Sequence, residues 1–186
     1  IVNITSNEIL SNATLEINNT NYTMSGSGIK WNKNISLSNG TFNYRVYGND
    51  TFGNSKVSDE FIITIDLFSP VWSNNETNIT NTKKNDIVQF NITWNDTASL
   101  SYYIFSWNNS GSWDNSTLGL LEGKNQILSI NKTVTANKNS AIGYKFYAND
   151  TAGNFNETDT YIFSVDNSVP SILIVNLTST DFLNRT

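Results

Sequence analysis

The segment YRVYGNDTFGN at residues 44–54 occurs a second time, as YKFYANDTAGN at residues 144–154. The likeness resumes after a short gap, where FIITID at 61–66 matches YIFSVD at 161–166. Self-similarity at a fixed period is the sequence signature of repeated structural units. The period is about one hundred residues, which suits a small sandwich domain and is too long for a solenoid repeat. The chain is therefore expected to contain two copies of one domain.

Apolar and polar residues alternate with period two along several segments, and no window keeps the apolar stripe of a helix. Aromatic and β-branched residues are abundant, proline is scarce, and turn signals such as Asn39-Gly40 separate the segments. The pattern predicts an all-β fold built of tandem immunoglobulin-like β-sandwich domains. The rows expected to face a core are Phe42, Tyr44 and Val46; Phe61, Ile63 and Ile65; Val88, Phe90, Ile92 and Trp94; Ile142, Tyr144 and Phe146; and Tyr161, Phe163 and Val165.

The two copies begin at different points of the repeat. VNIT at 2–5 resembles FNIT at 90–93, so the first domain is expected to begin at its second strand. We predict an incomplete first domain at 1–68 that lacks its first strand, and a complete second domain at 69–168. Residues 169–186 are expected to supply a spare strand, either the first strand of a next repeat or a donor strand.

The last eighteen residues, 169–186, resemble residues 69–86, which open the second domain. One interpretation is that the chain is a piece of a longer array, so that its partners are neighbouring domains. The other is donor-strand exchange, in which Ile172, Ile174 and Leu177 of one copy complete the open edge of another. Such a contact is head to tail between copies of the chain and would propagate into a filament.

Composition narrows the chemistry that the chain can perform. It has no cysteine and no histidine, which removes thiol chemistry and the commonest general base and metal ligand at neutral pH. The net charge of −5 and the lack of a basic cluster argue against nucleic acid as a partner. No apolar run approaches the length of a membrane span.

No residue is expected to be catalytic, and no cofactor is expected. The available carboxylates Glu122, Glu157, Asp114 and Asp159 form no recognisable acid–base pair, so we predict that the chain is not an enzyme. Calcium is not expected either, because the repeated turns carry one carboxylate each, Asp50 or Asp150, and a calcium site needs several oxygen ligands.

A loop around two tryptophans is a candidate ligand site. Trp107, Trp113 and Asp114 combine aromatic rings with polar groups, as sugar-binding surfaces do. The alternative is that Trp107 ends a strand and packs inward while Trp113 covers the end of the core. The loop therefore keeps open a second function, that of a carbohydrate- or protein-binding adhesin module.

Asparagine is unusually common, and 18 of the 32 asparagines begin an N-x-S/T tripeptide, the acceptor of N-linked glycans. An exposed strand face alternates polar residues and would enrich such pairs by itself, but asparagine is a poor strand former. We therefore expect covalent N-glycans, with some acceptors unoccupied. The candidates are Asn3, Asn12, Asn18, Asn21, Asn34, Asn39, Asn49, Asn75, Asn78, Asn91, Asn95, Asn108, Asn115, Asn131, Asn149, Asn156, Asn176 and Asn184.

The repeated Y-x-x-Y-x-N-D-T-x-G-N turn, the (F/Y)-I-x-x-(I/V)-D strand after it and the proline boundary resemble Ig-like repeats of archaeal cell-surface proteins. Such repeats occur in S-layer-associated proteins, adhesins and extracellular filaments. The resemblance implies an extracellular or cell-surface location and a structural, non-catalytic role in a filament or surface layer. It says less about the task than about the place, because fold alone does not decide function.

Overall fold

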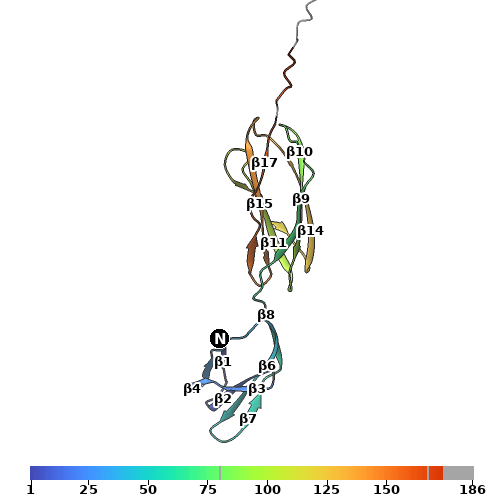
Figure 1. The fold of residues 1–186 in the computed structure, drawn as a ribbon. Coiled ribbons are helices and arrows are strands. Elements are labelled where there is room, and N and C mark those ends of the chain that lie inside the picture. Colours follow the sequence, from blue (N-terminus) through green and yellow to red (C-terminus); the bar gives the residue numbers. More distant parts are fainter. Residues whose placement is uncertain (80, 167, 174–186) are drawn as a thin grey trace, which may run out of the picture.

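The computed structural model describes residues 1–79, 81–166 and 168–173, and these residues form strands and no helix. Strands β1–β8 make a first unit and strands β9–β17 a second, and the two lie end to end (Figure 1). In the first unit the strands are β1 (Val2–Thr5), β2 (Leu10–Ile17), β3 (Thr20–Thr23), β4 (Ser25–Ser27), β5 (Lys30–Lys33), β6 (Gly40–Asp50), β7 (Ser55–Val57) and β8 (Phe61–Ile65). In the second they are β9 (Val71–Thr77), β10 (Ile87–Asn95), β11 (Leu100–Trp107), β12 (Asp114–Asn115), β13 (Gly119–Leu120), β14 (Asn125–Thr133), β15 (Ala141–Asp150), β16 (Phe155–Glu157) and β17 (Tyr161–Ser164).

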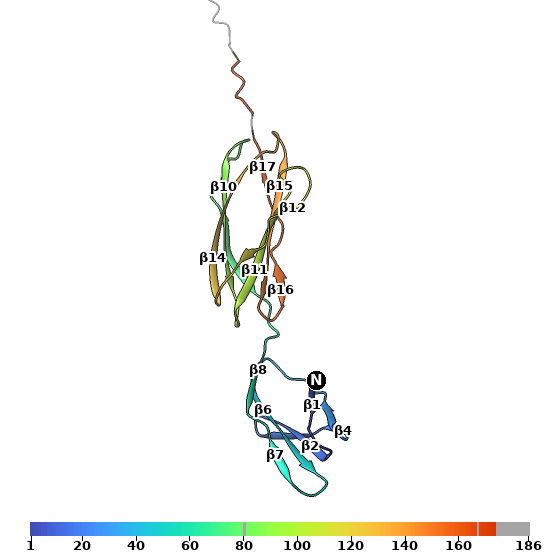
Figure 2. The ribbon, with the colours of Figure 1, turned by 180° about the vertical axis from the view of Figure 1, so that it is seen from behind.

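The second unit is a sandwich of two antiparallel sheets, seen from behind in Figure 2. One sheet has the order β14-β10-β9, and the other has the order β12-β11-β15-β16, with β13 on β11 and β17 on β15. The inward rows predicted on β10 and β15 are buried, with Trp94 and Phe146 both at 0% exposure. The core between the sheets is formed by Val88, Phe90, Ile92, Trp94, Leu100, Phe105, Trp107, Leu121, Leu128, Val134, Ile142, Tyr144, Phe146, Ala148 and Val165.

The first unit repeats this plan with fewer strands. Its sheets have the orders β1-β5-β4 and β3-β2-β6-β7, with β8 on β6. A two-residue turn joins β2 to β3, and Asn18 and Asn19 both have positive φ there (44° and 64°), as a type I′ hairpin requires. The chain is thus an all-β protein of tandem immunoglobulin-like β-sandwich units, which confirms the predicted fold class.

The two units share one strand register. Leu10 lies opposite Asp50 on β2 and β6, a bulge follows, and Ile17 lies opposite Tyr44. On β11 and β15, Leu100 lies opposite Asp150 before a bulge at the same place, and Trp107 lies opposite Tyr144. The sequence repeat is therefore a repeat of hydrogen-bonding register as well as of residue type.

The alignment of β1 with β10 differs by two residues from the one that the VNIT and FNIT motifs indicate. Ser6 donates its backbone N–H to the carbonyl of Ile29, and Asp96 does the same to Lys124, so that Ser6 corresponds to Asp96. A shift of two residues keeps every side chain on the same face of a strand, so alternation alone cannot detect it. By this register β1 corresponds only to the last residues of β10, and Ile4 matches Trp94.

Candidate functional site

A groove of about 490 Å³ lies beside β1 in the first unit. Ile1, Val2 and Asn3 form one wall and Ile63 and Ile65 of β8 the other. Its remaining lining comes from Ile17, Ile35, Leu37 and Tyr44. Nearly all of these side chains are apolar, so the groove is the open interior of a sandwich.

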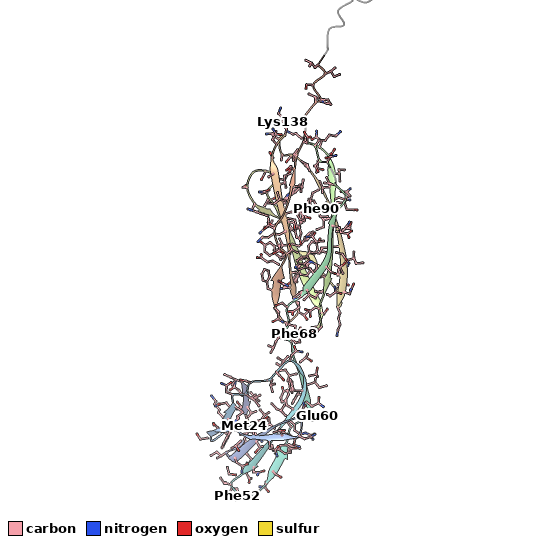
Figure 3. The ribbon with its side chains drawn as sticks, viewed as in Figure 1. Met24, Phe52, Glu60, Phe68, Phe90 and Lys138 are labelled. Carbon is pink, nitrogen blue, oxygen red and sulfur yellow. The ribbon has the colours of Figure 1, made fainter. Side chains whose placement is uncertain are left out.

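In the second unit the same place is filled. Phe90 is completely buried there (labelled in Figure 3), and its ring centroid lies 4.6 Å from that of Tyr144 and 4.8 Å from that of Phe105. By the shared register, Tyr144 corresponds to Tyr44 on the groove floor. By the same register β1 corresponds to residues 92–95, so no residue of β1 matches Phe90.

Strand β9 closes the second unit along the outer edge of β10. Trp72 lies opposite Trp94 and packs edge-on against Tyr161 of β17, with ring centroids 6.2 Å apart. Further along, Thr82 forms a parallel bridge to Val165, so this segment spans from one sheet to the other. Among the described residues of the first unit, no strand pairs with the corresponding edge of β1.

Apolar side chains of β8 are exposed to solvent in the first unit. Phe61 is 49% exposed and Ile63 40% exposed, although both were predicted to face a core. Their equivalents in the second unit, Tyr161 and Phe163, are half-buried and pack against the core. An open strand edge beside an apolar face is a site where another strand can add, because the main-chain groups and the pockets are both unpartnered.

The predicted donor residues lie at the other end of the chain. Ile172 and its neighbour Leu173 are each 87% exposed and belong to no strand. Ile174 and Leu177 lie outside the described residues, as do the acceptors Asn176 and Asn184. In a single copy, Ile172 is therefore available for contact with another molecule.

The repeated Asn-Asp-Thr-x-Gly-Asn segments form matching turns. The carboxylate of Asp50 accepts hydrogen bonds from the backbone N–H (2.8 Å) and side-chain amide (2.7 Å) of Asn54, and that of Asp150 does so from Asn154 (2.9 and 2.7 Å). Gly53 has φ of 89°, the left-handed conformation that favours glycine. The hydrogen bond from the Asn54 side chain lowers the pKa of Asp50, with help from the backbone donors.

The surroundings of the two turns differ. Asp150 lies in a group with Asp66, which follows β8, and Asp96, which follows β10. One carboxylate oxygen of each lies within 4.8 Å of the others. Burial raises the pKa of Asp96, and the charges of Asp66 and Asp150 raise it further. Counting one carboxylate per turn missed this arrangement, because two of the three come from other segments.

The two tryptophans of the candidate ligand loop lie in different surroundings, one in the core and one at the surface. Trp107 is a core residue at 9% exposure, so its ring faces are covered. Trp113 is 49% exposed and lies over Gly143, where an added Cβ would stand 3.3 Å from its ring. Trp113 and Asp114 line a shallow groove of about 650 Å³ together with Asn115, Lys145 and Tyr147.

The glycan acceptors differ in whether their amide nitrogen, the atom that carries a glycan, is free. The amide of Asn156 donates to the carbonyl of Pro70 at 2.7 Å, and the amide nitrogen of Asn75 is buried, so a glycan at either would disrupt packing. The half-buried acceptors are Asn49, Asn75, Asn91, Asn95, Asn108, Asn149 and Asn156. The exposed ones are Asn3, Asn12, Asn18, Asn21, Asn34, Asn39, Asn78, Asn115 and Asn131.

The four carboxylates considered for catalysis are dispersed. Glu157 forms an ion pair with Lys145 at 2.9 Å. Glu122, Asp114 and Asp159 are exposed. Among the described residues, the one group of three acidic side chains close enough to share an ion contains none of these four.

No helix among the described residues is long and apolar enough to cross a membrane.

Comparison with known proteins identifies no family for this chain. The sequence matches no protein-family model and no curated protein. Among solved structures, the chain is similar to the fibronectin(III)-like modules of CbhA from Clostridium thermocellum. The identity is 12% and the TM-score 0.44, over 89% of this chain and 85% of that one. At this level of similarity, function has to be argued from the residues themselves.

Proposed function

We propose that the chain is a structural, non-catalytic part of a glycosylated extracellular filament or surface layer. In this proposal its units are joined head to tail by a strand that enters the groove beside β1. The observation that carries the proposal is the contrast between the two units. In the second unit β9 and Phe90 cover the core, and in the first unit an apolar groove lies beside β1.

The occupant that we propose is the segment from Ser171 onward of a second copy. In the sequence repeat this segment corresponds to the residues of β9. Within the second unit, β9 pairs with the edge of β10 and covers the core. Ile172 corresponds in the repeat to Trp72. The ring of Trp72 packs against Tyr161 of β17, the strand that corresponds to β8 in the first unit. Ile174 and Leu177, the other candidate donor residues, are apolar and follow in the same segment of the sequence. Each large apolar side chain moved out of water contributes roughly 1.5–3 kcal/mol before the ordering cost.

Two variants with complementary defects test this assembly. Deletion of residues 171–186 removes the donor, and Ile63→Asp places a charge in the acceptor wall, since Ile63 lines the groove. Each variant alone should remain monomeric in sedimentation velocity, whereas the unmodified chain should form chains visible by electron microscopy. A mixture of the two variants should yield a dimer and nothing larger, because it offers one working donor and one working acceptor.

Ile127→Asp is the matched control, because Ile127 is 70% exposed on β14 and away from the groove. It should assemble like the unmodified chain. Circular dichroism of each variant should show the same strand content. Assembly that survives the deletion, or a monomeric unmodified chain at high concentration, would refute strand exchange and leave the groove to a neighbouring domain of a longer chain.

The extracellular location is proposed from the acceptor tripeptides. An N-glycan adds hydrated bulk, and several exposed acceptors lie on or beside edge strands, where glycans would hinder unwanted sheet pairing. Native material should yield glycopeptides at exposed acceptors such as Asn21 and Asn131 and none at Asn75 or Asn156. The absence of any glycopeptide would contradict this part of the proposal.

A second candidate function, ligand binding, is favoured by the shallow groove at Trp113. A half-exposed indole flanked by Asp114, Asn115 and Lys145 offers a stacking face and polar groups, as carbohydrate recognition needs. Trp113→Ala should abolish selective binding on a glycan array, while Leu118→Ala, at a 63% exposed position, should not. An array with no selective binder would remove this candidate.

A further inference from the structure

Three aspartates from distant parts of the sequence meet where the first unit joins the second. Asp66 is the first residue after β8, Asp96 follows β10, and Asp150 ends β15. The backbone brings them together: Leu100 pairs with Asp150 across β11 and β15, and Thr151 donates its N–H to the carbonyl of Ser99 at 2.8 Å. The amide of Asn154 donates to the carbonyl of Asp66 at 3.1 Å, which holds the connecting segment against the second unit.

The oxygens of this group are close together and incompletely bonded. One carboxylate oxygen from each aspartate lies within 4.8 Å of the other two, and Asp150 is 99% buried. Independently of that spacing, the Oδ2 atoms of Asp66 and Asp96 are shielded from solvent and accept no hydrogen bond. Among the described residues none of the three carboxylates forms an ion pair; Lys124 acts on Asp96 only from a distance.

The fold does not require this concentration of charge. In the first unit Ser6 occupies the position of Asp96, and the turn around Asp50 keeps the same hydrogen bonds to Asn54. Asp96 accepts the backbone N–H of Ala98, and a neutral asparagine or serine could accept the same hydrogen bond. The carboxylates of Asp66 and Asp96 each accept a hydrogen bond through one oxygen, but their Oδ2 atoms are buried with no hydrogen bond and no counter-charge among the described residues. Such atoms are costly, which points to a cation that balances them.

We propose that Asp66, Asp96 and Asp150 bind a Ca²⁺ ion at the junction of the two units. Calcium takes six to eight oxygen ligands in an adaptable geometry, and water completes the shell where the protein supplies fewer. The unpartnered Oδ2 atoms of Asp66 and Asp96 and a carboxylate oxygen of Asp150 supply the charge. The ion ties the segment after β8 to two loops of the second unit and so stiffens the junction, independently of how copies assemble.

The exposed connecting residues give a direct readout. Leu67 (60% exposed) and Phe68 (53% exposed) follow Asp66 and are cleavage sites for chymotrypsin. With the metal-stripped chain of residues 1–186, calorimetric titration of Ca²⁺ should show one site per chain. Saturating Ca²⁺ should slow cleavage at Leu67 and Phe68 several-fold, and EDTA should restore the faster rate.

Neutral variants locate the site. Asp66→Asn and Asp96→Asn should each weaken Ca²⁺ binding at least about tenfold and remove the protection from chymotrypsin, because each takes away one ligand charge. Asp159→Asn, an exposed acidic residue of the same unit, is the matched control and should bind like the unmodified chain. Failure to bind Ca²⁺ at millimolar concentration would overturn the proposal, and so would binding that Asp66→Asn and Asp96→Asn leave unchanged.

Discussion

Phe90→Ala tests the idea that one buried ring decides whether a unit is closed or open. Phe90 is completely buried and packs within 4.6–4.8 Å of Tyr144 and Phe105, measured between ring centroids. Phenylalanine-to-alanine changes in cores cost about 3–5 kcal/mol, since they lose transfer free energy and leave a cavity. The variant should therefore leave a cavity in the second unit, with a loss of stability near the middle of that range, about 4 kcal/mol.

Urea unfolding followed by tryptophan fluorescence measures the effect. Four of the five tryptophans belong to the second unit and only Trp31 to the first, so the main fluorescence change reports the second unit. With a denaturant dependence of about 1–3 kcal/mol per molar urea, a loss of about 4 kcal/mol lowers the midpoint by roughly 2 M.

The control for this measurement is Phe155→Ala, which removes an aromatic ring that is 56% exposed in the same unit. Its midpoint should move by far less, because exposed truncations leave no cavity. A Phe90→Ala midpoint within about 0.5 M of the unmodified chain, given the same denaturant dependence, would refute the reasoning, since it would show that the sandwich closes without the ring.

Three further changes address single features of the fold. Leu15→Ala should destabilise the first unit by about 2–5 kcal/mol, because Leu15 is fully buried, and only the Trp31 transition should move. The pKa of Asp50 is lowered in the folded state, so its carboxylate stabilises the first unit at pH values above the ordinary pKa near 4. This contribution is lost as the pH falls through the folded pKa. The stability of the Asp50→Asn variant should therefore depend less on pH in acid unfolding. Gly143→Val would place Cβ 3.3 Å from the ring of Trp113 and should displace that indole, which a shift in its fluorescence would report and which should be absent in a Trp113→Phe background.

The repeat and its strands could be predicted from the sequence because each depends on interactions between residues close together in the chain. Alternation with period two follows from strand geometry, and it identified the buried faces of Val88, Phe90, Ile92 and Trp94 correctly. The Asn-Asp-Thr-x-Gly-Asn turn was readable because Gly53 and Asp50 act within a few residues of each other. The alignment of β1 with β10 was two residues off, since such a shift leaves the faces unchanged.

The candidate sites depend on contacts between distant segments, which no local pattern encodes. Whether Trp107 faces a ligand or the core is decided by the sheet opposite it, and the structure buries it. The sequence by itself determined the repeated sandwich fold and the inward faces of β10 and β15, because side-chain alternation and turn chemistry act over a few residues. It did not determine the exposure of Phe61 and Ile63, which were predicted to face a core. Only the tertiary structure decided that Asp66, Asp96 and Asp150 converge and that an apolar groove lies beside β1, because both depend on which sheets and loops face each other across the core.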